Sequence, residues 1–196
     1  MKNIVIGLTG PIASGKNTVA GILGRHGAAI IDADSVGHRA ILPQSKAWHG
    51  IIKAFGSKVL NRGGAINRKK LAHIVFSNKN ALKRLNSITH PEMRKMIREQ
   101  LRSARLEGKK LIVVNAAILK EMKLLPLVDK VVVVMARKNL RVNRLVRAGL
   151  SRSDAIARIN SQIPDPEYRK MADIVIDNDQ DTSKLKEKVK RMIASL

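Results

Sequence analysis

The chain has 196 residues, the length of one compact domain with room for an insertion, and it contains no cysteine. Disulfides, thiolate zinc sites, iron–sulfur clusters and cysteine nucleophiles are therefore excluded. The 38 lysines and arginines against 15 acidic residues give a formal net charge of +23, while only 2% of the residues are aromatic. These basic residues are spread along the chain and no aromatic stacking platform is expected, so we predict no specific nucleic-acid partner.

No apolar run approaches the roughly 18 residues that a membrane helix needs, and the first residues do not read as a signal peptide. The expectation is a cytoplasmic protein with no membrane partner, present as a monomer or a weak homo-oligomer.

Five short apolar runs predict strands. They lie at residues 4–8, 28–31, 111–114, 131–135 and 174–176. Continuous apolar runs are typical of strands buried on both faces, and the helical patterns between them imply right-handed crossovers. The predicted class is α/β, with a parallel sheet of about five strands covered by helices on both faces.

Two longer stretches without strands are predicted to be helical additions to this sheet. The first separates the second and third strands by about 80 residues, far more than one crossover needs. It contains helical patterns at 47–55, 68–76, 80–88 and 91–106, and Pro91 suits the first turn of the last of these. The second stretch is helical over 140–163 and is rich in arginine.

The motif Gly-Pro-Ile-Ala-Ser-Gly-Lys-Asn-Thr at residues 10–18 follows the first predicted strand and opens a helix at 17–27. It fits the phosphate-binding P-loop G-x-x-x-x-G-K-[ST] at every position but the last, where Asn17 stands. The backbone N–H groups, the helix N-terminus and Lys16 would then bind phosphates. The hydroxyl that usually contacts Mg²⁺ is absent at Asn17, and Thr18 comes one residue late. The alternative is a glycine-rich turn that binds nothing.

Asp32 and Asp34 come directly after the second predicted strand. Ligands of open parallel sheets bind beyond the carboxyl ends of the strands, which predicts Asp32 beside the P-loop. A carboxylate there accepts a proton from a hydroxyl nucleophile or holds Mg²⁺ through water. For Asp34, a site role and capping of the helix that begins near Ser35 are left as alternatives.

An ordered series of motifs resembles the dephospho-CoA kinase family over nearly the whole chain. It comprises Gly-Leu-Thr-Gly at 7–10 with the P-loop, Ile-Asp-Ala-Asp at 31–34, Phe-Gly at 55–56, Ile-Asn-Arg-Lys-Lys-Leu-Ala at 66–72, Leu-Asn-Ser-Ile-Thr-His-Pro at 85–91, Arg-Ala-Gly-Leu-Ser at 147–151 and Ala-Asp-Ile-Val-Ile-Asp-Asn at 172–178. Many families share a P-loop, whereas this ordered set is far more specific.

The resemblance implies transfer of the γ-phosphate of ATP to the ribose 3′-hydroxyl of dephospho-CoA, with Mg²⁺ as cofactor. It implies a nucleotide-binding core at 1–34, 111–136 and 166–196, a helical insertion for dephospho-CoA at 35–110, and a lid at 137–165. The implied catalytic residues are Lys16, Asp32, Arg144 and Arg147. ATP would contact Gly10, Ala13, Ser14, Gly15, Lys16, Asn17, Thr18 and Asn178, and the metal would contact Asn17 and Asp32.

Three departures from the family pattern accompany this resemblance. Asn17 replaces the usual serine, Asn115 and Ala117 stand where an Asp and a Pro are usual, and Gly63-Gly64 replaces an Asp-Gly turn. Two other functions stay open. One is another small-molecule P-loop kinase, such as a nucleoside monophosphate kinase, and the other is a basic nucleic-acid-binding NTPase.

Overall fold

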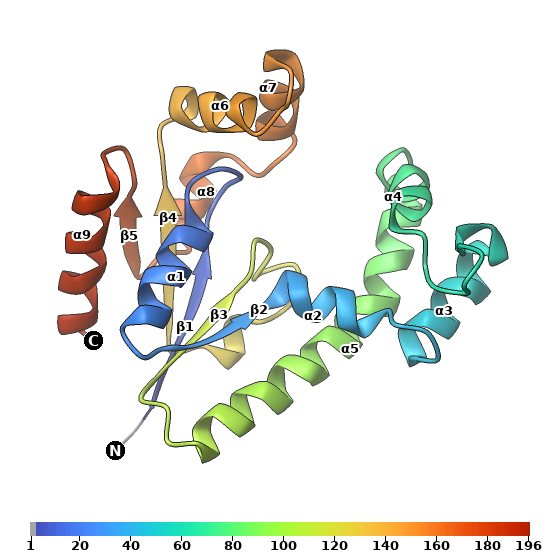
Figure 1. Ribbon diagram of the computed structural model, residues 1–196, viewed down its shortest axis with the longest axis horizontal. Coiled ribbons are helices and arrows are strands. Elements are labelled where there is room, and N and C mark those ends of the chain that lie inside the picture. The colour runs from blue at the N-terminus through green and yellow to red at the C-terminus, as the bar shows by residue number, and fades with distance from the viewer. Residues whose placement is uncertain (1–2) are drawn as a thin grey trace. The chain divides into compact units, whose positions relative to one another are not determined.

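Five strands form one sheet in the order β2-β3-β1-β4-β5 in the computed structural model, which describes residues 3–196 (Figure 1). β1 pairs in parallel with β3 and with β4, and β4 pairs in parallel with β5. The strands are β1 (Ile4–Thr9), β2 (Ala29–Asp32), β3 (Leu111–Asn115), β4 (Lys130–Met135) and β5 (Ile174–Asp177). The predicted α/β class with a five-stranded parallel sheet is confirmed, and each predicted strand is found within a residue of its expected ends.

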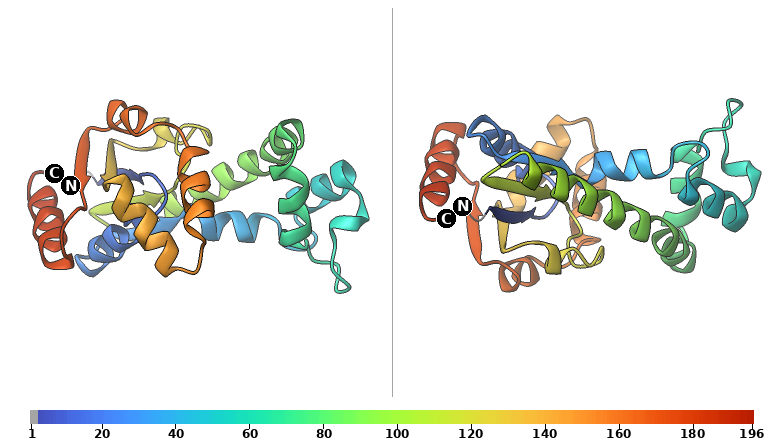
Figure 2. Two further views of the ribbon diagram at one scale, coloured as in Figure 1. Left: turned by 90° about the horizontal axis from the view of Figure 1, so that it is seen from above. Right: turned by 90° about the horizontal axis from the view of Figure 1, so that it is seen from below.

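The chain divides into two units, one formed by residues 1–31 with 101–196 and the other by residues 32–100. The first contains nearly all of the sheet, and helices cover both faces of this sheet. α1 (Lys16–Arg25) and α9 (Thr182–Ala194) lie on one face, and α8 (Asp165–Lys170) lies on the other (Figure 2). The sequence analysis did not predict α8.

The core of the sheet unit lies between the strands and the helices α1 and α9. Buried side chains from all of these elements form one cluster, which includes Leu8, Leu23, Val132, Val134 and Val189. α9 begins at a capping residue: the Asp181 side chain accepts a hydrogen bond from the backbone N–H of Lys184. This packing holds β1 rigidly below the loop that follows it.

The helical stretch predicted at 140–163 is two helices, α6 (Lys138–Arg147) and α7 (Arg152–Asn160). The chain turns between them at Gly149, whose φ of 94° is in the left-handed region that favours glycine. Ser151 then caps α7 by accepting a hydrogen bond from Asp154 N. Leu145 and Ile159 pack in a cluster that also includes Ile12 and Ala13 of the P-loop. The two helices therefore pack directly on the P-loop.

The second unit is helical, as predicted. It contains α2 (Ala33–Ala40), α3 (Lys46–Phe55), a 3₁₀ turn at Ser57–Val59, α4 (Arg68–Phe76) and most of α5 (Lys79–Leu106). Its core includes Ile51, Val59, Leu71 and Val75. Side-chain caps define the starts of α3 and α4, since Ser45 accepts from Trp48 N and Asn67 accepts from Lys70 N.

The prediction of separate helices at 80–88 and 91–106 is wrong, because α5 runs through Pro91 without a break. Proline removes one hydrogen-bond donor and crowds the preceding turn, which usually kinks or ends a helix. Here buried or half-buried apolar residues lie on both sides, such as Ile88 before Pro91 and Ile97 after it. Their burial offsets the missing hydrogen bond. None of the helices among residues 3–196 combines the length and apolar character needed to span a bilayer.

Candidate active site at the P-loop

The loop between β1 and α1 has the backbone shape of an anion-binding site. Gly10, Ala13 and Gly15 have φ angles of 153°, 59° and 97°, so three of its six residues adopt positive φ. Such alternation turns successive N–H groups toward a common centre. Gly15 is the N-cap residue of α1 and has no side chain that could accept a hydrogen bond. The first backbone N–H groups of the helix are therefore not occupied by a side-chain cap.

Glycine is required at Gly15 by close packing as well as by φ. A Cβ there would collide with Nδ2 of Asn178. The hydroxyl of Ser14 is buried and has no hydrogen-bond partner among the described residues. A buried hydroxyl without a partner costs free energy. An oxygen-rich ligand seated in the loop would supply such a partner.

Arg144 and Asn178 hold the P-loop in this shape. Nη1 of Arg144 donates to the carbonyl oxygens of Ala13 and Ser14 at 2.9 and 3.1 Å, and Nη2 donates to the carbonyl of Asn178 at 2.9 Å. Asn178 is buried, and its Nδ2 donates to the Ser14 carbonyl at 2.7 Å. The structure thus brings both predicted residues to the P-loop, where their contacts are with its backbone.

Arg147, three residues after Arg144 on α6, has a different environment. Its side chain is exposed, whereas that of Arg144 is half-buried. Among the hydrogen bonds of the described residues, those to the P-loop come from Arg144 and not from Arg147. A joint role of the two arginines stays a prediction.

Lys16 lies between two asparagine side chains. Its Nζ donates to Oδ1 of Asn115 at 2.6 Å and to Oδ1 of Asn17 at 3.1 Å. Nδ2 of Asn115 donates in turn to Oδ1 of Asn17 at 3.1 Å. Asn115 ends β3 and is 3% exposed, so the sheet holds it firmly. Thr18 and Asn17 are exposed on the first turn of α1.

Asp32 is the last residue of β2 and also the N-cap of α2. Its Oδ1 accepts a hydrogen bond from the backbone N–H of Ser35 at 2.7 Å. Of the two alternatives for Asp34, capping is wrong: Asp32 is the cap, and Asp34 is an exposed residue of the first turn. The cap fixes the rotamer of Asp32, so the direction of its carboxylate is defined by the start of α2.

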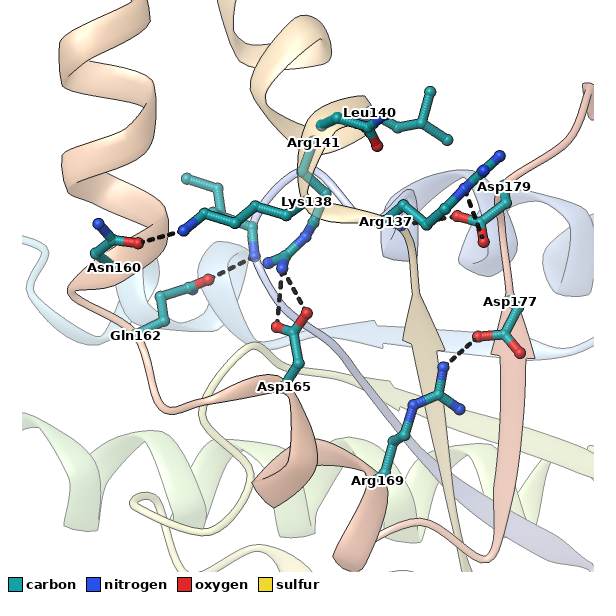
Figure 3. A network of polar contacts seen from close by, with 12 residues as sticks. Arg137, Lys138, Leu140, Arg141, Asn160, Gln162, Asp165, Arg169, Asp177 and Asp179 are labelled. Atoms are coloured by element: carbon teal, nitrogen blue, oxygen red, sulfur yellow. Dashed lines mark hydrogen bonds and ion pairs between the residues drawn. The ribbon is translucent and has the colours of Figure 1, made fainter.

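An ion pair with a buried arginine anchors the helices that cover the P-loop (Figure 3). Nη2 of Arg141 donates to both carboxylate oxygens of Asp165, at 2.8 and 2.7 Å. The Arg141 side chain is 2% exposed and that of Asp165 is 41% exposed. The contact ties α6 to the start of α8. Beside it, burial raises the pKa of Tyr168, and the charge of Glu121 adds to this effect.

Two more ion pairs join α8 and the start of α6 to β5 and to the loop that follows β5. Nη2 of Arg169 lies 2.7 Å from Oδ1 of Asp177, and Nε of Arg137 lies 3.4 Å from Oδ2 of Asp179 (Figure 3). The backbone N–H of Arg137 also donates to Asp179 at 2.7 Å. These pairs are partly exposed, so each contributes little to stability alone. The first joins α8 to β5, and the second joins the start of α6 to the loop after β5.

Comparisons with known proteins identify the family that shares this arrangement. The model of the dephospho-CoA kinase family matches residues 4–184. The chain belongs to the dephospho-CoA kinase family. A dephospho-CoA kinase of Carboxydothermus hydrogenoformans is 43% identical over 186 residues, which cover 94% of this chain and 90% of that protein. One from Geobacter sulfurreducens is 41% identical over 191 residues, which cover 97% of each chain.

A solved structure agrees with this assignment. The dephospho-CoA kinase from Campylobacter jejuni has a TM-score of 0.74 and 32% sequence identity, and the match covers 100% of this chain and 97% of the other. The predicted family, fold and enzyme class are therefore confirmed: the chain is a P-loop kinase of coenzyme A biosynthesis, with ATP as a substrate.

Sequence reasoning predicted no contact for two residues that the structure brings to the site, although Gln162 belongs to the predicted lid. Gln162 follows α7, and its Oε1 accepts a hydrogen bond from the backbone N–H of Ile12 at 2.8 Å. Asn115 was noted only as a departure from the family pattern, and it is a direct partner of Lys16. For Asn115, the sequence did offer a signal: a polar side chain at the carboxyl end of a buried strand, where ligands of such sheets bind.

Proposed function

We propose that this chain transfers the γ-phosphate of ATP to the ribose 3′-hydroxyl of dephospho-CoA, which gives CoA and ADP. The observation that carries the proposal is the P-loop itself, whose positive φ angles, uncapped helix start and anchored lysine form a site for a polyphosphate. Phosphoryl transfer depends mainly on positioning and on charge stabilisation. The family assignment supplies the identity of the acceptor.

The P-loop would hold the phosphates of ATP through the backbone of residues 10–15 and the first turn of α1. Lys16 would neutralise charge on the transferring group, because a fixed cation in a dry site stabilises the transition state. Asn17 and Thr18 lie on that first turn and are proposed to contact phosphates from its exposed side. Asn178 would shape the adenine side of the site through its contact with the P-loop backbone.

Asp32 is proposed as the residue that orients the acceptor hydroxyl and takes its proton. Its support is its place at the carboxyl end of β2, where the sheet unit gives way to the helical unit. The helical insertion, predicted at 35–110, would bind dephospho-CoA. The predicted lid at 137–165 would bring Arg144 and Arg147 toward the phosphates and exclude water, which otherwise competes as acceptor.

Of the predicted magnesium ligands, Asn17 fits such a role poorly, and Asp32 has one of its two carboxylate oxygens engaged. Oδ1 of Asn17 already accepts hydrogen bonds from Lys16 and Asn115, and Oδ1 of Asp32 caps α2. Among residues 3–196, no group of three or more His, Cys, Asp or Glu side chains is placed to hold a metal. We therefore propose Mg²⁺ only as a cation that accompanies ATP.

We further propose that the substrates are small molecules only, that the protein acts in the cytoplasm without a specific nucleic acid, and that it is a monomer or a weak homo-oligomer. The dispersed distribution of the 38 basic residues supports the absence of a specific nucleic-acid site.

A coupled assay of ADP release tests the proposed reaction. ATP is offered with dephospho-CoA, AMP, shikimate or RNA, and each product is identified by mass. ADP release with dephospho-CoA and formation of CoA are expected, with Lys16→Ala as the inactive control. Turnover with AMP in place of dephospho-CoA would favour a nucleoside monophosphate kinase. ATP hydrolysis that only RNA stimulates would favour a nucleic-acid-dependent NTPase.

A further inference from the structure

Two amides occupy the chain positions from which P-loop enzymes usually take their protein ligands for Mg²⁺. These ligands are a hydroxyl directly after the P-loop lysine and a carboxylate at the end of a neighbouring strand. Asn17 follows Lys16, and Asn115 ends β3, the strand that pairs with β1. Both replacements are neutral, and each side chain is both a donor and an acceptor of hydrogen bonds.

The two amides satisfy one another and the lysine. Oδ1 of Asn115 accepts from Lys16 Nζ at 2.6 Å, while Nδ2 of Asn115 donates to Asn17. Oδ1 of Asn17 accepts from both Lys16 and Asn115. An amide is needed at Asn115 for this pattern, because a carboxylate there has no N–H to donate to Asn17. A metal ion bound to Asn17 Oδ1 would have to displace both of its donors.

Asn17 and Asn115 are neutral, so this side of the site lacks the negative charge of a P-loop site that has a carboxylate at position 115. A carboxylate at position 115 would form an ion pair with Lys16 and partly cancel its field at the phosphates. Asn115 positions Lys16 with a short charge-assisted hydrogen bond and cancels none of its charge. Bound Mg²⁺ lowers the net negative charge of a nucleotide by two and so weakens its attraction to Lys16. Neither amide offers the metal a charged ligand that would compensate for this loss.

We propose that Asn17 and Asn115 form a neutral clamp on Lys16, and that the P-loop consequently binds a nucleoside diphosphate or triphosphate without Mg²⁺ at least as tightly as its Mg²⁺ complex. The proposal rests on the proposed function, because it concerns the same nucleotide site. It assigns to Asn115 the positioning of Lys16 and the selection between metal-free and metal-bound nucleotide.

Isothermal titration with ADP, once in excess EDTA and once in excess Mg²⁺ at equal ionic strength, tests this proposal without relying on turnover. For the wild-type protein we expect a Kd in EDTA that is lower than the Kd in Mg²⁺ or equal to it within about threefold. For Asn115→Asp we expect binding at least about tenfold tighter in Mg²⁺ than in EDTA, because the carboxylate both attracts the metal and pairs with Lys16. Asn80→Asp, at an exposed position of α5, makes the same change in net charge and serves as the matched control.

The outcomes separate this proposal from the proposed function. Wild-type binding that is more than about threefold tighter in Mg²⁺ overturns the neutral clamp and leaves the kinase assignment intact. The absence of ADP binding in both buffers contradicts the nucleotide site itself. The wild-type comparison decides the matter even where Asn115→Asp does not fold. If Asn80→Asp changes the ratio as strongly as Asn115→Asp, net charge accounts for the effect and the clamp is overturned.

Discussion

Gln162 and Ile12 are separated by 150 positions, yet the Oε1 atom of Gln162 accepts a hydrogen bond of 2.8 Å from the backbone N–H of Ile12. Gln162 lies between α7 and α8, so the end of the predicted lid is joined to the tip of the P-loop. Arg144 of α6 is joined to the same loop through the carbonyls of Ala13 and Ser14. Any opening of these helices must therefore break both contacts or carry the P-loop with it.

Loss of the Gln162 side chain tests this coupling. Gln162→Ala removes the acceptor of a half-buried N–H, so we expect a loss of stability of about 1 kcal/mol together with a higher KM for ATP. Gln162→Glu keeps an acceptor oxygen and should retain most of both properties. Urea denaturation and initial-rate kinetics provide the two measurements. An unchanged KM in Gln162→Ala would show that the P-loop keeps its shape without this contact.

The two predicted lid arginines should respond differently to substitution. Arg144→Ala removes three hydrogen bonds to backbone carbonyls, so we expect a loss of stability of about 2 kcal/mol and slower phosphoryl transfer. Arg147 is exposed, so Arg147→Ala should change stability by less than about 0.5 kcal/mol.

Both arginine variants are also expected to show more ATP hydrolysis per CoA formed, because an incomplete lid admits water. The ratio of ADP to CoA measures this directly. An unchanged ratio in Arg147→Ala would place that side chain on a purely solvated surface, and equal loss of stability in both variants would contradict the separation of their roles.

The two single substitutions that break the Arg141–Asp165 ion pair should lower stability by different amounts. Asp165→Ala leaves a guanidinium that is 2% exposed without this carboxylate, which should cost about 3 kcal/mol or more. Arg141→Met leaves a carboxylate that is 41% exposed and can be hydrated, so its cost should be clearly smaller. The double variant should recover part of the stability lost in Asp165→Ala. Thermal melts of the three variants check this order, and equal losses in both single variants would contradict it.

Asp32→Asn should lower kcat far more than it raises the KM for ATP. The amide oxygen still accepts the hydrogen bond from Ser35 N, so α2 keeps its cap, but an amide does not take a proton from the acceptor hydroxyl. Steady-state kinetics with both substrates separate the two parameters. A raised KM with an unchanged kcat would assign Asp32 to binding alone, and a thermal melt confirms that the cap is kept.

The net charge of +23 should produce only weak and unselective binding to nucleic acid. Affinity for a labelled duplex and for a single strand should fall steeply between about 50 and 200 mM salt, since it arises from counterion release. Kinase activity should fall less, because enclosed charges are screened less. Tight binding at high salt with a preference for one sequence would contradict this expectation and support a nucleic-acid function.

Local patterns in the sequence were sufficient to predict the strands and the P-loop. A continuous apolar run such as that of β4 is stable only when both faces are buried, and a glycine-lysine motif between strand and helix has few other uses. The same reasoning divided α5 in two, because the penalty of Pro91 is local while the burial that offsets it comes from distant residues. It also did not predict the end of α6, although Gly149 follows this helix in the left-handed conformation that favours glycine.

By itself, the sequence determined the class of fold, the phosphate-binding loop and the family, because each is recorded in residues that are adjacent or in a fixed order. Only the tertiary structure decided which side chains meet at that loop. Arg144, Gln162 and Asn115 reach it from segments about 100 to 150 positions away, and nothing in their local sequence specifies a partner. A parallel sheet brings the carboxyl ends of its strands to one edge, so the contact of Lys16 with Asn115 is set by strand order and not by distance along the chain.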